Sequence, residues 1–113
     1  FLLTLDPPAQ VTDSGTLTPD QPVLTYPLQV DAGTLVVVEM RAVVGEETDP
    51  VLVAYGGDGQ EIAFDDDGGG FPNARMSFIA PGGPIEVDAG VFEDFYGAYT
   101  LAVFGIGGAI TFG

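Results

Sequence analysis

Short apolar stretches recur along the chain, and Gly, Pro and Asp interrupt them at short intervals. The stretches are rich in β-branched and aromatic residues, and none shows the periodicity of an amphipathic helix. This pattern is typical of an all-β fold with short strands. It predicts strands at residues 1–5, 23–30, 34–44, 51–55, 61–64, 74–80, 84–89, 98–104 and 109–112.

Apolar and polar residues alternate within the longer stretches, so each predicted strand has one apolar face. Tyr26 and Leu28, for example, share a face opposite Thr25. One-sided burial in short antiparallel strands favours two sheets packed face to face over a closed barrel. We therefore expect residues 1–113 to form a single domain, an all-β antiparallel two-sheet β-sandwich of the jelly-roll kind without significant helix. Pro27 cannot donate a ladder hydrogen bond, so its strand should lie at an edge or contain a bulge.

Acidic residues far outnumber basic ones. The chain has 17 Asp and Glu residues against two basic residues, Arg41 and Arg75, which gives a net charge of −15. We expect no nucleic-acid partner, because so few cations cannot replace the counterions of phosphates. Anionic membrane surfaces are disfavoured for the same reason, and the apolar stretches are too short to insert across a bilayer.

The chain contains no Cys and no His. It therefore lacks disulfides, the commonest general base and the commonest zinc ligand. Two carboxylates could in principle cleave a glycosidic bond, with Glu61 or Glu93 beside an aspartate. The sequence shows no environment that would raise the pKa of either residue, so we expect no enzymatic activity. A small domain without disulfides usually gains stability from a bound metal or from subunit contacts.

The segment TDPVLVAYGGDGQEIAFDDD (48–67) resembles the signature of bacterial pre-peptidase C-terminal domains, D-P-x-L-x-L-Y-D-x-x-G-x-x-L-A-x-N-D-D. SGTL (14–17) and the segment 26–40 are similar to the opening strands of the family, and GAYTLAV (97–103) is similar to its closing strand. The resemblance covers residues 14–103. The matching residues of the signature are Asp49, Pro50, Leu52, Tyr55, Gly59, Ala63, Asp66 and Asp67.

The resemblance implies a jelly-roll-like β-sandwich of the kind appended to secreted hydrolases and found in other extracellular proteins. Some of these modules bind calcium and some bind polymeric substrates. Neither property is a catalytic activity. We therefore expect a protein that is secreted and acts outside the cell or at its surface. The chain starts at Phe1 without a signal-peptide pattern, so we expect that a targeting segment has been removed.

The run AFDDDGGG (63–70) places three carboxylates in a row before three glycines. Antiparallel pairing of 51–55 with 61–64 should bring Asp49 towards this run. Calcium takes six to eight oxygen ligands, both carboxylates and backbone carbonyls, and such a loop offers both kinds. The alternative is a hydrated acidic turn. The residues that we expect to hold a Ca²⁺ ion are Asp49, Asp65, Asp66, Asp67, Glu93 and Asp94.

The terminal strands, 1–5 and 109–112, lie outside the part that resembles the family. They either complete the sheets of their own domain or add to the sheet of a neighbouring subunit, and head-to-tail addition would build a filament. The residues that we expect in such a subunit contact are Phe1, Leu2, Leu3, Leu5, Ile110 and Phe112.

Two functions follow from these observations. The first is a calcium-stabilised, self-associating extracellular module that forms a homo-oligomer or polymer. The alternative is a targeting module that binds a polysaccharide or protein substrate for a secreted hydrolase. Exposed aromatic residues along one sheet would favour the targeting module, and terminal strands without an intramolecular partner would favour self-association. The sequence favours self-association, because no linker to an enzyme is evident.

Overall fold

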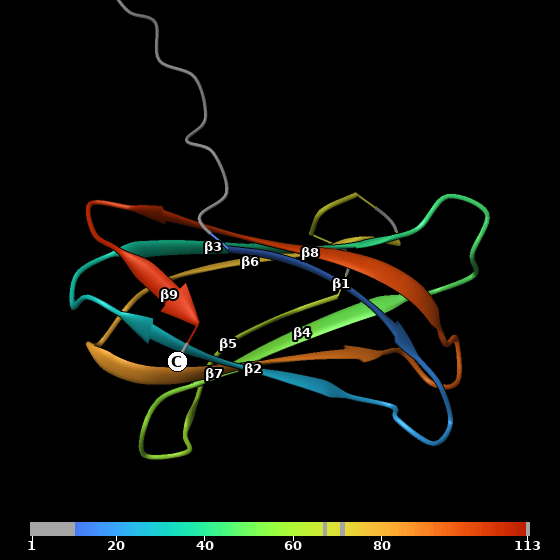
Figure 1. Ribbon diagram of the computed structural model, residues 1–113, viewed down its shortest axis with the longest axis horizontal. Coiled ribbons are helices and arrows are strands. Elements are labelled where there is room, and N and C mark those ends of the chain that lie inside the picture. The colour runs from blue at the N-terminus through green and yellow to red at the C-terminus, as the bar shows by residue number, and fades with distance from the viewer. Residues whose placement is uncertain (1–10, 67, 71, 113) are drawn as a thin grey trace, which may run out of the picture.

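The computed structural model describes residues 11–66, 68–70 and 72–112. Within these residues the chain forms nine strands and no helix (Figure 1). The described part of the chain thus contains no helix capable of crossing a lipid bilayer. The strands are β1 (Val11–Leu17), β2 (Leu24–Val30), β3 (Leu35–Ala42), β4 (Pro50–Tyr55), β5 (Glu61–Asp65), β6 (Ala74–Ile79), β7 (Gly83–Val91), β8 (Gly97–Ile106) and β9 (Ile110–Phe112).

The strands form two stacked sheets, which Figure 1 shows edge-on. The four-stranded sheet has the order β1-β8-β3-β6, and the five-stranded sheet has the order β5-β4-β7-β2-β9. Every strand pairing is antiparallel. Among the described strands, the chain crosses from one sheet to the other at every connection except that between β4 and β5. The predicted antiparallel two-sheet β-sandwich is therefore confirmed.

Eight of the predicted strands are present, and their ends differ from the prediction by at most two residues. The predicted strand at 1–5 lies outside the described residues. The pattern missed β1, because its sequence VTDSGTL has buried side chains only at its two ends, Val11 and Leu17. Pro27 lies in the half of β2 that pairs with β7 alone, since β9 covers only Leu28–Val30. Its missing N–H is therefore tolerated at a partly free edge.

The C-terminal strand completes the sheet of its own chain. We expected Ile110 and Phe112 in a contact between subunits, but β9 pairs with Leu28–Val30 of β2, and Phe112 is opposite Leu28. Ile110 is buried with 4% of its surface exposed, so its side chain packs into the core of its own chain. A free backbone edge on β2 and an apolar core beside it offer this strand an intramolecular site. The other residues expected in the contact lie outside the described residues: Phe1, Leu2, Leu3 and Leu5.

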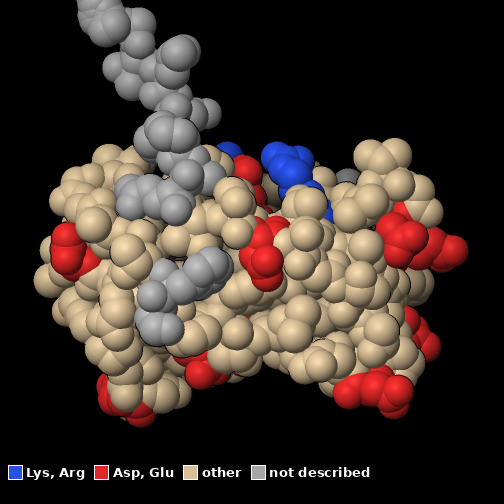
Figure 2. All heavy atoms as spheres, in the orientation of Figure 1, with Lys and Arg blue, Asp and Glu red and all other residues tan. Residues whose placement is uncertain are grey.

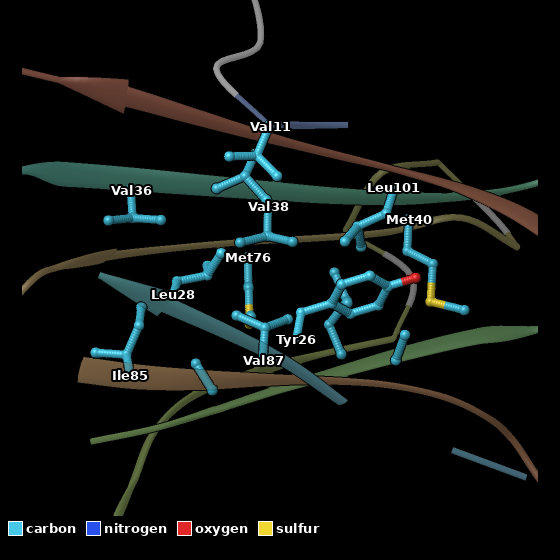
Figure 3. Packing of buried hydrophobic residues seen from close by; sticks show 14 of the residues in the cluster. Val11, Tyr26, Leu28, Val36, Val38, Met40, Met76, Ile85, Val87 and Leu101 are labelled. Atoms are coloured by element: carbon cyan, nitrogen blue, oxygen red, sulfur yellow. The ribbon is translucent and has the colours of Figure 1, made fainter. Parts of the chain in front are cut away.

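Alternate side chains of β2, β3, β4, β6, β7 and β8 point between the sheets and form one apolar core (Figure 3). Val36, Val38 and Met40 of β3 are fully buried, as the alternation predicted. Figure 3 shows Ile85 and Val87 of β7 pointing into the same layer from the five-stranded sheet. Each fully buried side chain of this size contributes about 1.5–3 kcal/mol to stability.

A hydrogen-bonded group of polar side chains crosses this core. The hydroxyls of Tyr26 in β2 and Tyr99 in β8 lie 2.5 Å apart, and the Tyr26 hydroxyl donates to Oδ2 of Asp13 in β1 at 2.8 Å. Since a hydroxyl has one proton, the Tyr99 hydroxyl donates to Tyr26. Burial, reinforced by the hydrogen bond to Tyr99, raises the pKa of Tyr26 far above its ordinary value. These bonds connect the two sheets, because β2 lies in one and β1 and β8 lie in the other.

We expect the substitution Gly15→Ala to destabilise the fold by about 1–3 kcal/mol through overpacking. A Cβ at Gly15 would lie 2.7 Å from the hydroxyl of Tyr99 and 2.9 Å from Cζ of the same ring, so the ring would have to move. Urea unfolding measures the effect.

Gly90→Ala is the matched control. Its Cβ would meet Cγ2 of Val23 at 3.6 Å, an ordinary contact. We expect this change to leave stability unchanged or to raise it by about 0.5–1 kcal/mol, since Ala restricts the unfolded chain more than Gly does. Equal destabilisation by both substitutions would contradict the role assigned to Gly15.

Candidate functional site

The loops that carry the predicted calcium ligands meet at one end of the sandwich, on the right in Figure 1. The backbone N–H of Asp49 donates to the carbonyl of Phe95 at 3.2 Å, and the N–H of Phe92 donates to the carbonyl of Asp49 at 2.9 Å. The N–H of Ala42 donates to Oδ1 of Asn73 at 2.9 Å. These bonds connect the segment 43–49 to the turn 92–96, and they connect Asn73 to the end of β3.

Aromatic side chains form much of the surface between these loops. A hollow of about 450 Å³ lies between the segment 46–49, Pro72, Phe92 and Phe95. Phe92 and Phe95 are 48% and 41% exposed, so this end presents apolar surface to the solvent. Glu93 adopts a left-handed conformation with φ of 51° in the turn that carries them. It lines a separate hollow on the outer face of the five-stranded sheet.

Asp65 has a structural role in the loop that follows β5. Its Oδ2 accepts hydrogen bonds from the backbone N–H of Gly68 at 2.6 Å and of Arg75 at 2.8 Å. Arg75 belongs to β6, so the carboxylate connects the edge strand of one sheet to the edge strand of the other. A Cβ at Gly68 would lie 2.7 Å from Oδ1 of Asp65, and Gly70 has a φ of 91°. The glycines therefore allow the chain to fold around the carboxylate.

The described residues do not include three acidic side chains that could hold one metal ion. Asp49 is half-buried between the loops, Asp66 is half-buried after β5, and Asp94 is exposed in the turn between β7 and β8. Asp67 lies outside the described residues. The calcium site predicted from the sequence is therefore untested and stays a prediction.

We expect Asp65→Ala to lower the free energy of unfolding by about 1.5–3 kcal/mol, the usual value for losing hydrogen bonds to a charged group. Thermal unfolding in millimolar calcium and in chelator should show the same loss, because backbone N–H groups are the partners of this carboxylate.

Asp66→Asn combined with Asp67→Asn tests the calcium prediction itself. If the two residues bind calcium, the loss should appear in calcium and disappear in chelator. An equal loss in both solutions would contradict calcium binding by this pair.

A groove crosses the outer face of the five-stranded sheet. It consists of two adjoining hollows of about 280 Å³ and about 500 Å³, and Tyr55 and Asp88 line both. Val53 pairs with Asp88 across β4 and β7, and Tyr55 pairs with Glu86, so these side chains share the outer face. The described residues that line the groove include Val51, Val53, Tyr55, Glu86, Asp88 and Tyr96.

A missing side chain opens the smaller hollow. Gly90 lies opposite Val51 in the ladder between β4 and β7, and its position leaves the space between Val51 and Val23 unfilled. The nearest heavy atom to an added Cβ is Cγ2 of Val23 at 3.6 Å, so close packing does not require glycine here. A larger side chain at this position would fill the groove without forcing the strands apart.

The groove is acidic. Glu86, Asp88 and Glu93 line it, and its described lining contains no Lys or Arg. Oδ1 of Asp88 accepts a hydrogen bond from the hydroxyl of Thr25 at 3.0 Å, which orients the carboxylate. A hydrogen bond to Asp88, followed by the negative charge of Asp88, raises the pKa of Glu86 above its ordinary value. The two carboxylates thus favour a proton or another cation between them.

We expect Glu86→Gln to stabilise the fold slightly at neutral pH and to reduce its pH dependence. Because the pKa of Glu86 is raised on folding, the folded chain binds more protons than the unfolded chain above pH about 4.3, the ordinary Glu value. Stability therefore falls as the pH rises through this range. Urea midpoints measured against pH test the expectation. Glu47→Gln in the loop 43–49 controls for the loss of one charge, and identical profiles for the two variants would contradict the coupling to Asp88.

Glu86 and Asp88 were not predicted from the sequence as site residues. A signal was present, because the alternation in PIEVDAG places Pro84, Glu86, Asp88 and Gly90 on one face of a strand. The neighbours of that strand could not be identified from spacing, since β4 and β2 come from distant parts of the chain.

The chain matches no protein-family model, and a search of curated proteins finds no significant match. Among solved structures, the pre-peptidase C-terminal domain of a collagenase from Bacillus anthracis superposes with a TM-score of 0.71. This chain has the fold of a pre-peptidase C-terminal domain. The two are 16% identical, and the superposition covers 85% of this chain and 90% of that domain. PliG of Aeromonas hydrophila, a periplasmic inhibitor of g-type lysozyme, superposes with a TM-score of 0.62 at 17% identity, over 87% of this chain and 85% of that one.

Residues that carry the sequence resemblance have structural roles in this pre-peptidase C-terminal-like sandwich. Leu52 is fully buried, and Tyr99 belongs to the hydrogen-bonded group in the core. Gly97 leaves room for Thr48, whose hydroxyl would lie 2.3 Å from a Cβ at this position and donates to the carbonyl of Ala98 at 2.9 Å. The resemblance is thereby explained by folding requirements.

Proposed function

We propose that the chain is a non-catalytic binding module of an exported protein, and that it holds a basic polypeptide segment in the groove of the five-stranded sheet. The acidic, aromatic-lined groove is the observation that carries this proposal. Of the two functions considered from the sequence, this is the protein-binding form of the targeting module.

The exposed aromatic residues favour binding over strand addition. Tyr55 and Tyr96 line the groove, and Phe64 of β5 pairs with Val53 in the same outward-facing row with 55% of its surface exposed. Aromatic side chains supply large apolar contact areas with little loss of conformational entropy. In contrast, the described C-terminal strand β9 already pairs within its own chain, so it gives no support to assembly through that strand.

The charges of the groove favour a polypeptide with Lys or Arg side chains. Glu86, Asp88 and Glu93 would attract cationic groups, and the chain as a whole has a net charge of −15, which would steer a basic partner towards it. A neutral polysaccharide would leave these carboxylates without charged partners. An extended segment suits the groove because the groove crosses several strands.

The neighbours in fold support a module that works beside or against another protein. One is a domain of a collagenase, and the other is an inhibitor of a lysozyme, located in the periplasm. We infer from them an extracellular or periplasmic location for this chain, in agreement with the expectation of export.

We expect a phage-displayed library of random peptides, panned on the immobilised chain, to be enriched in peptides with Lys and Arg beside aromatic or aliphatic residues. Gly90→Val should weaken the binding of these peptides about tenfold or more, about 1.4 kcal/mol, because its side chain fills the smaller hollow. High salt should weaken binding as well, because it screens the three carboxylates.

Thr100→Val is the control, since it places the same Val side chain on the outer face of the other sheet. It should leave peptide binding unchanged. Enriched peptides without a basic bias, or peptides that bind wild type and Gly90→Val equally, would refute the proposed role of the groove.

A further inference from the structure

The outer face of the four-stranded sheet carries a continuous group of apolar side chains, which we call the apolar patch. Two of its members, Ile79 and Ile106, are 63% and 48% exposed, although large aliphatic side chains are usually buried. Its other members are half-buried. The apolar patch consists of Leu35, Val37, Ile79, Phe104 and Ile106.

The strand register places these side chains side by side. Leu35 of β3 lies directly opposite Ile79 of β6 on one side and Ile106 of β8 on the other, so one row across three strands is entirely apolar. In the next row on the same face, Val37 lies opposite Phe104. Directly opposed side chains in neighbouring strands are about 5 Å apart, so the two rows form one surface.

This face also carries the two basic residues of the chain. Arg75 and Arg41 lie beyond the apolar patch, and both approach Oε2 of Glu39, at 3.6 Å and 3.7 Å. The rows of this face thus carry two positive charges and one negative charge, a net charge of +1, in a chain of net charge −15. Figure 2 shows the basic residues on its upper side, over the four-stranded sheet, with acidic residues beside them and others at the centre, both ends and the lower side of the view.

We infer that the four-stranded sheet is a dimerisation face, occupied by the same face of a second copy of this chain. Two chains of this charge repel one another in most orientations, whereas among the described residues of this face Glu39 is the one carboxylate, and both arginines lie close to it. A two-fold axis brings apolar patch against apolar patch, and the arginines of one copy can lie near Glu39 of the other. Such an isologous contact closes on itself and forms a dimer.

The contact is small, and the dimer is therefore reversible. A face of four strands is about 15–20 Å wide at the usual strand spacing, which is small for a stable interface of about 800 Å² per partner. We expect association at micromolar concentrations.

The dimer would leave both five-stranded sheets facing outwards, so that two grooves could bind a partner with repeated basic segments. This last consequence rests on the proposed function, whereas dimerisation itself does not.

Sedimentation velocity of the full chain over a range of micromolar concentrations tests the inference. We expect a monomer–dimer equilibrium that shifts towards dimer at high salt, because salt screens the repulsion between the two acidic chains. Ile79→Glu combined with Ile106→Glu should weaken the dimer by about tenfold or more. Both side chains are exposed, and circular dichroism verifies that the sheet is retained.

Phe64→Glu combined with Val44→Glu is the matched control, because it adds the same charge at exposed apolar positions outside the face, 55% and 100% exposed. This variant should dimerise like the wild type. A chain that stays monomeric at every concentration and salt level, or equal weakening by both double variants, would overturn the inference. If the full chain is monomeric and removal of residues 1–5 produces a dimer, the N-terminal segment covers the apolar patch, and the proposal is wrong.

Discussion

The arrangement of the two sheets depends on a pair of buried tyrosines. Tyr26 and Tyr99 come from different sheets, and their hydroxyls meet in a hydrogen bond only when the strands β2 and β8 lie in their observed register. A slip of one residue in β2 would turn Tyr26 outwards and remove this hydrogen bond from the buried Tyr99 hydroxyl, and a buried polar group that loses its partner costs about 1–3 kcal/mol. Gly15 provides the space that the Tyr99 ring needs.

The register maintained by this pair determines the character of both outer faces. In β8 it places Phe104 and Ile106 beside Val37 and Leu35, and in β2 it places Thr25 beside Asp88. The two faces consequently differ in charge, since carboxylates line the groove of one sheet and both arginines lie on the other. The two proposals rest on this asymmetry, with a basic partner in the groove of one sheet and a second copy of the chain on the other sheet.

The acidic run at 65–67 shows how a local motif can have a structural meaning as well as a functional one. Three carboxylates before three glycines suggested a cation site, and the calcium prediction remains to be tested at this loop. The described part of the loop gives Asp65 a role that needs no metal, because two backbone N–H groups occupy its Oδ2. Glycine at position 68 is required by the close approach of this carboxylate.

The sequence alone determined the fold class, the ends of eight strands to within two residues, and the inward face of β2, β3 and β8, because the alternation of apolar residues is a local property of each strand. It also indicated the family likeness, since positions such as Leu52, Gly97 and Tyr99 are constrained by packing.

The sequence did not reveal the groove, the apolar patch or the internal pairing of β9. Each of these depends on which strands become neighbours. The groove needs Gly90 opposite Val51, and the apolar patch needs Leu35 between Ile79 and Ile106. Only the tertiary structure brings such residues together, because the pairing of distant strands is decided by packing of the whole core and not by spacing along the chain.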